Sequence, residues 1–223
     1  MARAVRTAND GGAGLGAAPV RRLSAGARRE QLFDVALQLF AERGYRATTM
    51  DDIAEAAGVT KPLLYQHFSS KRGLYLELVD SVAAELLAAI AEAAGNAEGP
   101  RQQVERGFAA YFRMVVTHEA AFHLLYGRDV TGDDELGDPL RRVEDAIAEA
   151  IDPLIAAGLS PEHRRQLAYA VVGMAEGVSR HWIATRAERG AGRSGTADDE
   201  EAERLAARLA DLAWAGLRSV HAD

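Results

Sequence analysis

The sequence predicts an all-α protein in two parts: an N-terminal helix-turn-helix unit of three helices, and a longer C-terminal helical region. Beyond residue 23 the chain is rich in Ala, Leu, Glu and Arg, and the whole chain holds only 6 Pro in 223 residues. No stretch alternates apolar and polar residues as a half-buried strand would. Apolar residues instead recur at helical spacing, between residues that cap helices or break them.

Composition excludes several classes of protein. The chain is 48% hydrophobic and has no cysteine, which excludes wholesale disorder, disulfide scaffolds, Cys-ligated zinc and thiol catalysis. No apolar run reaches the roughly 18 residues of a membrane span. Arg3 and Arg6 are not followed by the apolar stretch of a secretory signal. We therefore expect a soluble, cytoplasmic protein.

Charge is distributed unevenly along the chain, although the net formal charge is −7. Residues 1–75 hold 11 Lys or Arg against 7 Asp or Glu, a net charge of +4. Residues 76–223 hold 15 against 26, a net charge of −11. Such a division indicates two parts that face different partners, unless it arises by chance.

The first helices are predicted from local signals. Residues 1–23 are rich in Gly, Ala and Arg without periodicity, which predicts a disordered arm. The GGAGLG run at 11–16 follows no strand, so it does not indicate a nucleotide loop. Ser24 is a plausible N-cap for a helix that runs to about Arg43, and Gly44 suits a left-handed C-cap. The apolar face of this helix comprises Leu32, Ala36, Leu39 and Phe40.

Two short helices follow. Thr49 caps the first of them, with Asp52 at the capping-box position. Gly58 supplies a tight turn, and Thr60 caps a second short helix over 61–68. Further helices are predicted near 71–94, 101–117, 119–126, 139–157, 161–187 and 198–220, with loops at 127–138 and 189–196.

Two short helices joined by a Gly-containing turn, after a longer helix, are typical of a helix-turn-helix. The second short helix would then enter the major groove of DNA with its N-terminal residues. The only lysines of the chain, Lys61 and Lys71, bracket this helix. The alternative is a three-helix packing unit whose basic face is merely solvated.

The segment from Arg29 to Leu78 resembles the DNA-binding domain of TetR-family transcriptional regulators. The resemblance rests on LF at 39–40, GY at 44–45, TT at 48–49, IAEAAGV at 53–59, KPLLYQHF at 61–68, SK at 70–71 and GLY at 73–75. Together with VVGMAEG at 171–177, this wording is similar to that of actinobacterial regulators of fatty-acid synthesis that respond to long-chain acyl-CoA. The resemblance implies a DNA-binding domain at 24–75 and an effector-binding and dimerisation domain at 76–223.

The resemblance also implies the DNA contacts. Tyr65, His67 and Lys71 would bind phosphates, as would either Thr48 or Thr49. Four residues at the start of the second short helix would face base edges, namely Thr60, Lys61, Pro62 and Leu63. Leu63 can meet a thymine methyl group. Arg21, Arg22, Arg28 and Arg29 are expected to form a solvated basic arm, although they have the charge to reach a neighbouring groove.

The C-terminal region is expected to pair two chains and to hold a ligand. The predicted dimer interface comprises Gly173, Gly177, His181, Leu209, Trp214 and Leu217. The predicted effector site comprises Phe108, Tyr111, Phe112, Arg113, Met114, Phe122, Tyr126 and Arg128. Arg113, Arg128 or Arg180 would anchor an anionic head if the ligand were a fatty acyl group. Each set has a plain alternative, because apolar residues at helical spacing also build the core of a single chain.

No catalytic residue, metal or cofactor is predicted. His118 and His123 are five residues apart and do not share a helix face, so they form no metal pair. The sequence thus predicts a homodimeric, ligand-responsive DNA-binding regulator, most simply a repressor released from a palindromic operator by a small apolar effector such as an acyl-CoA. Two alternatives remain: a helical carrier of small molecules, and an architectural DNA-binding protein without an effector.

Overall fold

The structure is a computed structural model that describes residues 24–126, 134–155, 158–188 and 196–220. The predicted arm at 1–23 and its GGAGLG run lie outside these residues. The helices are α1 (Ala25–Ala47), α2 (Met50–Ala56), α3 (Lys61–His67), α4 (Lys71–Gly95), α5 (Pro100–Thr117), α6 (Glu119–Tyr126), α7 (Asp134–Ile151), the 3-10 turn η1 (Asp152–Leu154), α8 (Pro161–Glu188) and α9 (Thr196–Leu217). The described part of the chain contains no strand, which confirms the all-α prediction.

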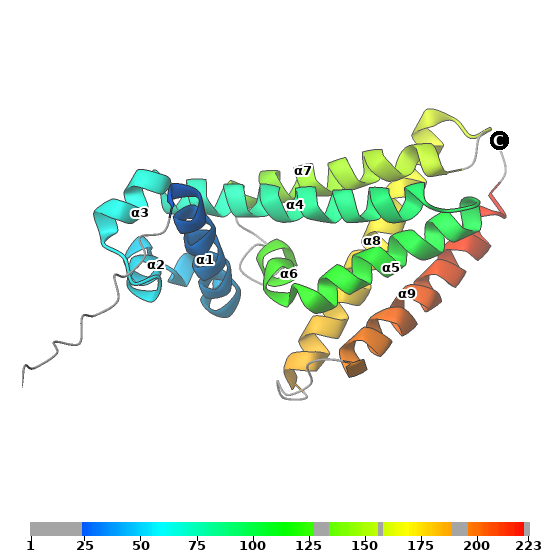
Figure 1. Cartoon of the computed structure of the whole chain (residues 1–223). Helices are drawn as coiled ribbons and strands as arrows, with labels where there is room; N and C mark the ends of the chain where they lie inside the picture. The colour runs from blue at the N-terminus through cyan, green and yellow to red at the C-terminus, as the bar shows by residue number, and fades with distance from the viewer. Residues whose placement is uncertain (1–23, 127–133, 156–157, 189–195, 221–223) are drawn as a thin grey trace, which may run out of the picture.

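The helices form a small head and a larger body that share α4 (Figure 1). In the head, α1, α2 and α3 pack around the start of α4. The body consists of α4 with α7 alongside it, α5 packed against α9, and α8 crossing behind. The predicted boundary at residue 75 falls inside α4, so one continuous helix belongs to both parts.

Short-range signals determine how the head is built. Thr49 and Asp52 form the expected capping box at the start of α2. Gly58 makes the turn between α2 and α3 with φ 64°, a conformation that costs glycine little. Gly44 has the positive φ of 82° that was expected, but its ψ of 162° lies outside the left-handed helical region, so it kinks α1 instead of capping it, and α1 continues to Ala47. The head therefore folds largely as its local sequence indicates.

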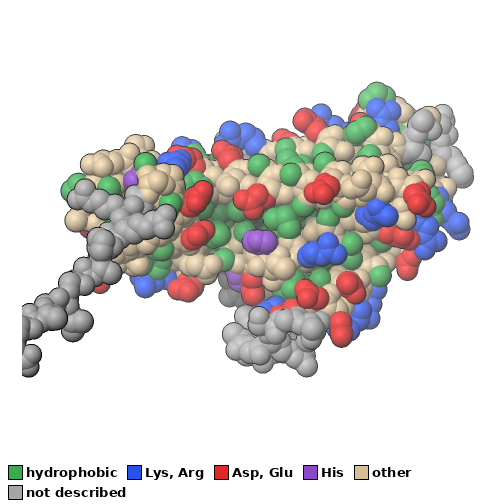
Figure 2. Space-filling view, viewed as in Figure 1, with side chains coloured by type: hydrophobic (Ala, Val, Ile, Leu, Met, Phe, Trp, Pro, Cys, Tyr) green, Lys and Arg blue, Asp and Glu red, His purple; other side chains and the backbone are tan. Residues whose placement is uncertain are grey.

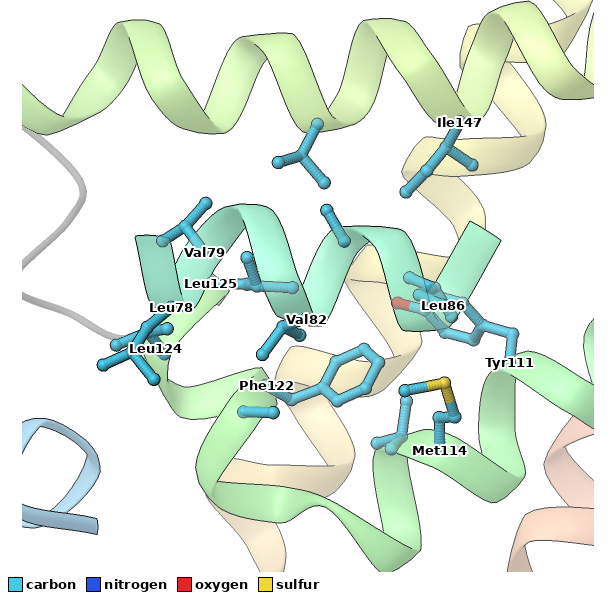
Figure 3. Close-up of a cluster of buried hydrophobic side chains, with 14 of the residues drawn as sticks. Leu78, Val79, Val82, Leu86, Tyr111, Met114, Phe122, Leu124, Leu125 and Ile147 are labelled. Atoms are coloured by element: carbon cyan, nitrogen blue, oxygen red, sulfur yellow. The ribbon is translucent and has the colours of Figure 1, made fainter. Parts of the chain in front are cut away.

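The core of the body forms where α4, α5, α6 and α7 meet. Figure 3 shows Leu86 of α4, Tyr111 of α5 and Phe122 of α6 facing one another. The ring of Tyr111 meets that of Phe122 edge-on, with centroids 5.5 Å apart. Nearer the head, the buried Tyr75 hydroxyl donates to the Leu124 carbonyl of α6 at 2.7 Å. The start of α4 is thereby joined to the body as well as to the head.

The largest error of the sequence prediction concerns α7. This helix begins at Asp134, five residues before the predicted start, so Gly137 and Pro139 did not prevent it. It ends at Ile151 rather than near 157, and η1 follows. The end has a clear cause, because Pro153 disfavours helical geometry in the residue before it and offers no N–H to continue the helix.

Within the described ranges, none of the helices is both long enough and apolar enough to cross a membrane.

Candidate functional site

The inner face of α3 is held by aromatic packing. Phe68, 1% exposed, lies directly after α3, and its ring centroid is 5.2 Å from that of Phe33 on α1. The Arg29 guanidinium lies 4.4 Å from the Phe68 ring centroid, donates to the His67 carbonyl at 3.0 Å and pairs with Glu77 of α4. The C-terminal end of α3 is thus tied to both α1 and α4.

The outer face of α3 carries most of the predicted DNA-binding residues. Lys61 and Pro62 are exposed, Tyr65 is 43% exposed, and Leu63 and His67 are half-buried. Thr60 is exposed at the N-cap of α3, and its hydroxyl makes no capping hydrogen bond. The structure therefore brings these six residues onto and around one short helix, with donors at its N-terminal end.

Lys61 is not isolated at this surface. Its Nζ lies 2.7 Å from Oδ1 of Asp51, the second residue of α2. The hydrogen bond and the charge of Asp51 raise the pKa of Lys61. Both side chains are more than half exposed, so water screens the pair and its contribution to stability is small. Lys61 can therefore exchange this partner for another acceptor at little cost.

The two predicted threonines have different roles. Thr49 is exposed, and its hydroxyl accepts from the Asp52 N–H at 3.1 Å and donates to Oδ2 of Asp52 at 2.6 Å. Thr48 is fully buried (0% exposed), and its hydroxyl donates to the Gly44 carbonyl at 2.8 Å. The prediction that Thr48 offers its side chain to a phosphate is therefore wrong: this hydroxyl serves the end of α1. Thr49 remains the candidate of the two.

Lys71 was predicted to bind a phosphate, but its ammonium contacts backbone carbonyls instead. Its Nζ donates to the carbonyls of Tyr45 at 2.8 Å and Thr48 at 2.9 Å, and lies 3.5 Å from that of Arg46. The ammonium also lies 4.3 Å from the Tyr45 ring centroid. An ammonium has three N–H donors, and these carbonyls engage them. Lys71 therefore holds the end of α1, where its charge also complements the helix dipole.

Two of the four arginines predicted as a basic arm are part of α1. Arg28 donates to Oε1 of Gln31 at 2.6 Å, and Arg29 makes the contacts described above. Both were expected on a solvated arm, although the helix predicted from Ser24 already included them; the structure places both inside α1, where Arg29 packs on Phe68 and pairs with Glu77. Arg21 and Arg22 lie outside the described residues.

The body contains an apolar cavity of about 80 Å³. Its walls come from the C-terminal half of α4, from α5, α7 and η1, and from the middle of α8, with contributions from α6 and α9. Residues that line it include Ile90, Val104, Phe108, Tyr111, Tyr126, Ile147, Ile151, Leu154, Val172, Ala175, Glu176 and Leu217. Because α4 also enters the head, one helix contacts both the cavity and the DNA-binding unit.

The predicted effector residues divide into three groups. Phe108, Tyr111 and Tyr126 line the cavity, as expected. Phe112, Met114 and Phe122 are buried but do not line this cavity, so here they serve as core residues, and their contact with an effector stays a prediction. Arg113 is exposed and does not line the cavity, and Arg128 lies outside the described residues. Helical spacing identified the buried faces but not which of them border the cavity.

Sequence reasoning missed Glu176, a buried acid at the cavity wall. The residue is 8% exposed, and Nη2 of Arg180 lies 3.3 Å from its Oε2. Its Oε1 is buried and accepts no hydrogen bond from a donor among the described residues. Burial, followed by the neighbouring Glu144 carboxylate, raises its pKa from 4.5 to about 7. A signal existed, since Glu176 is one helical turn beyond the apolar Val172 and so shares its face.

The raised pKa of Glu176 predicts a pH-dependent stability. Between about pH 4.5 and 7 the folded state holds a proton that the unfolded state has released, so stability should fall as the pH rises through this window. In Glu176→Gln this fall should shrink by an amount on the order of 1–3 kcal/mol. Denaturant unfolding at pH 5 and pH 8 measures it, with the exposed Glu162→Gln on the same helix as control. An unchanged fall in Glu176→Gln would refute the assignment.

The predicted dimer residues lie on two different surfaces. Gly173, Gly177 and His181 are exposed along one side of α8, and a Cβ added at either glycine would meet no atom within 4 Å. Leu209 is buried and Leu217 lines the cavity, so both serve this chain's own interior, contrary to the prediction. Trp214 is half-buried. Among the described side chains of α9, the large apolar one that is exposed is instead Leu212, 62% exposed.

Both parts of the chain match known families. Residues 32–78 match the bacterial regulatory proteins of the tetR family, and residues 100–216 match the tetracyclin repressor-like C-terminal domain. The HTH-type transcriptional activator FasR of Mycolicibacterium smegmatis is 31% identical over 164 residues, which are 73% of this chain and 75% of FasR. The HTH-type transcriptional repressor KstR2 of Mycobacterium tuberculosis is 37% identical over 93 residues, 42% of this chain and 46% of KstR2.

Solved structures show the same fold. A TetR-like transcriptional regulator from Rhodococcus sp. RHA1 superposes with a TM-score of 0.68 and 27% identity, over 89% of this chain and 100% of the other. The regulator FadR from Bacillus subtilis, in complex with stearoyl-CoA, superposes with a TM-score of 0.68 over 86% of this chain and 99% of FadR. At 15% identity this second likeness concerns the fold alone.

Proposed function

The chain belongs to the TetR family of bacterial regulatory proteins, and from this premise we propose that it binds a palindromic operator as a homodimer through α3 and leaves it when a small, largely apolar effector enters the cavity. The observation that supports DNA binding most directly is the two-sided construction of α3. On the inner side, Leu64 of α3 and Phe68 directly after it are buried. On the outer side, Thr60, Lys61 and Tyr65 are exposed. A short helix held from behind in this way can present donors to the major groove.

Charge supports an orientation in which the head faces DNA. Acidic side chains lie along α4 on the face of the body that Figure 2 shows. Residues 76–223 carry a net charge of −11 against +4 for residues 1–75. Of the +4, residues 1–23 contribute +3, and residues 24–75, which include the head, contribute +1. Phosphates would therefore repel the body but not the head, so the electrostatic field favours approach by α3. Since operator DNA lies in the cytoplasm, we place the activity there.

The route from effector to DNA runs through α4. A cavity of about 80 Å³ is smaller than the roughly 300–1,000 Å³ of ordinary ligand sites, so an effector must move the surrounding helices apart. Ile90 and Ala94 of α4 line the cavity, and Lys71 at its other end holds the head. The effector would thus favour a second position of α4 and change the placement of α3. FadR, which shares this fold, holds stearoyl-CoA.

The dimer that we propose uses the open side of α8. Gly173 and Gly177 leave space for a second helix to approach closely, and Leu212 of α9 exposes apolar surface. A two-fold axis between such faces is the usual way to place two recognition helices on paired half-sites. FasR is named an activator and KstR2 a repressor. Repression by this chain therefore stays a prediction that depends on where its operator lies.

Substitution of Lys61 tests the role of α3. Lys61→Ala should weaken operator binding by about 1–3 kcal/mol, and more than it weakens binding to random DNA, because a base contact is lost. Fluorescence anisotropy with DNA from upstream of the protein's own gene measures both affinities. Arg101→Ala is the matched control, since Arg101 is likewise exposed and ion-paired but lies on α5 at the far end of the body. Equal losses on operator and random DNA would contradict a readout role.

The same titration separates the alternative functions. A helical carrier would bind neither operator DNA nor random DNA, even as a dimer. An architectural DNA-binding protein would bind DNA with an affinity that no apolar ligand changes. The proposed regulator requires both operator binding and its loss upon ligand addition.

A further inference from the structure

One end of the apolar cavity contains a single unsatisfied acceptor. Glu176 is 8% exposed and lines the cavity beside Tyr111, Tyr126 and Ala175. Its Oε1 makes no hydrogen bond within the described part of the chain. A buried acceptor left in this state is unfavourable, because it has lost its hydrogen bonds to water, and a donor from a bound molecule would restore one.

The groups around Glu176 determine which donor fits. The Glu144 carboxyl of α7 is close enough to disfavour the ionisation of Glu176 and to hydrogen-bond with it when one of the two is protonated. Arg180 reaches only Oε2 of Glu176, at 3.3 Å. The Tyr126 hydroxyl interacts with the carboxyl, and the Tyr111 hydroxyl accepts from Ser179 at 3.2 Å. Burial raises the pKa of both tyrosines. At this end the cavity wall therefore carries the Glu176 carboxyl and two neutral phenols. Glu144 and Arg180, whose side chain is 49% exposed, neighbour Glu176 without lining the cavity.

A ligand carboxylate or phosphate is poorly suited to this end. It would add a negative charge beside Glu144 and Glu176, and it has no proton to donate to the open oxygen. A hydroxyl supplies that proton, and so does a protonated amine, which also gains from the two carboxyls. Apart from Gln103 and Gly107, the rest of the cavity is lined by Ile, Val, Leu, Ala and Phe side chains, so it favours a ligand with an apolar body.

We propose that Glu176 selects the effector: the cavity takes an apolar molecule with a hydrogen-bond donor, a hydroxyl or a protonated amine, which binds Oε1 of Glu176, and it disfavours the matching carboxylate. This assignment rests on the proposed function, because it takes the cavity to be the effector site. It also replaces the predicted anchoring of an anionic head by arginine. Arg113 lies outside the cavity wall, and Arg180 is already paired with Glu176.

Three probes with one apolar body test the proposal: octylamine, octan-1-ol and octanoate, titrated calorimetrically into the full chain at pH 7. We expect the amine and the alcohol to bind at least about 10-fold more tightly than octanoate, a difference of about 1.4 kcal/mol. If octylamine binds more tightly than octan-1-ol, the donor meets ionised carboxyls. If octan-1-ol binds more tightly, the donor meets a neutral pair of carboxyls. Either order supports recognition of a donor by Glu176. Octanoate binding as tightly as the other two, or no binding of any probe, would overturn the proposal.

Variants connect the selectivity to Glu176. Glu176→Gln should reduce the ratio of octylamine to octanoate affinity about 10-fold, and Glu144→Gln should reduce it in the same direction. Glu162→Gln, exposed on α8, should leave the ratio unchanged. Circular dichroism shows whether each variant is folded. If Glu176→Gln does not fold, Glu144→Gln provides the test in its place. An unchanged ratio in a folded Glu176→Gln chain would refute the assignment.

Operator affinity measured alongside distinguishes the two levels of the argument. If the probes bind with the expected selectivity but leave DNA binding unchanged, the release mechanism fails and the chemistry of the cavity stands. If the chain binds its operator and the probes show no selectivity, the inference about Glu176 fails and DNA binding stands.

Discussion

Phe68→Ala should destabilise the DNA-binding head by about 3–5 kcal/mol and abolish operator binding. The Phe68 side chain is 1% exposed and packs against Phe33, and it carries the Arg29 guanidinium on its ring. Its loss would leave a cavity between α1 and α3 and release the end of the recognition helix. Denaturant unfolding followed by circular dichroism measures the stability, and anisotropy measures the binding.

Tyr65→Ala is the matched control, because it removes an aromatic ring three residues earlier from the other side of α3. Tyr65 is 43% exposed, so its loss should change stability by no more than about 0.5 kcal/mol. Its proposed phosphate contact should still be lost, which weakens DNA binding of every sequence alike. If Phe68→Ala and Tyr65→Ala destabilised the chain equally, the two-sided description of α3 would be wrong.

Lys71→Met should lower the free energy of unfolding by about 1.5–3 kcal/mol, because it removes charge-assisted hydrogen bonds to the end of α1. The carbonyls of Tyr45 and Thr48 would lose a donor, while the methionine retains most of the apolar stem. The slope of DNA affinity against salt concentration should not change, since Lys71 has no donor left for a phosphate. Unfolding curves and anisotropy titrations at several salt concentrations measure the two effects.

Arg72→Met provides the comparison for Lys71. Arg72 is the next residue of α4 and is exposed, so its loss should leave stability within about 0.5 kcal/mol of the parent chain. A Lys71→Met chain of unchanged stability whose salt slope falls by about 1 per subunit would show that Lys71 reaches a phosphate after all.

Features that depend on neighbouring residues were predicted well. The capping box of Thr49 and Asp52 and the turn at Gly58 involve contacts within one helical turn, so their sequence signals are nearly sufficient. Helix boundaries that depend on competing signals were predicted less well. The start of α7 at Asp134 was missed because Gly137 and Pro139 resemble a loop when read alone.

Site residues were likewise predicted correctly where they depend on local sequence and incorrectly where they depend on distant segments. Spacing placed Thr60, Lys61 and Tyr65 together, because a short helix brings them together without help from the rest of the chain. Lys71 was misassigned, because the carbonyls that receive its ammonium lie 23 to 26 residues earlier in the chain. Only the packing of α4 against the end of α1 brings these groups within reach.

By itself, the sequence determined the helical architecture, because periodicity, capping and turn chemistry act over a few residues. The family followed from the resemblance of motifs in residues 29–78 to TetR-family regulators. Only the tertiary structure decided which buried faces border a cavity. Phe108 and Phe112 lie one helical turn apart on α5 and share a pattern, yet only Phe108 lines the cavity. Glu176 became a candidate only when packing from α5, α6 and α7 closed around it, since burial is a property of many segments at once.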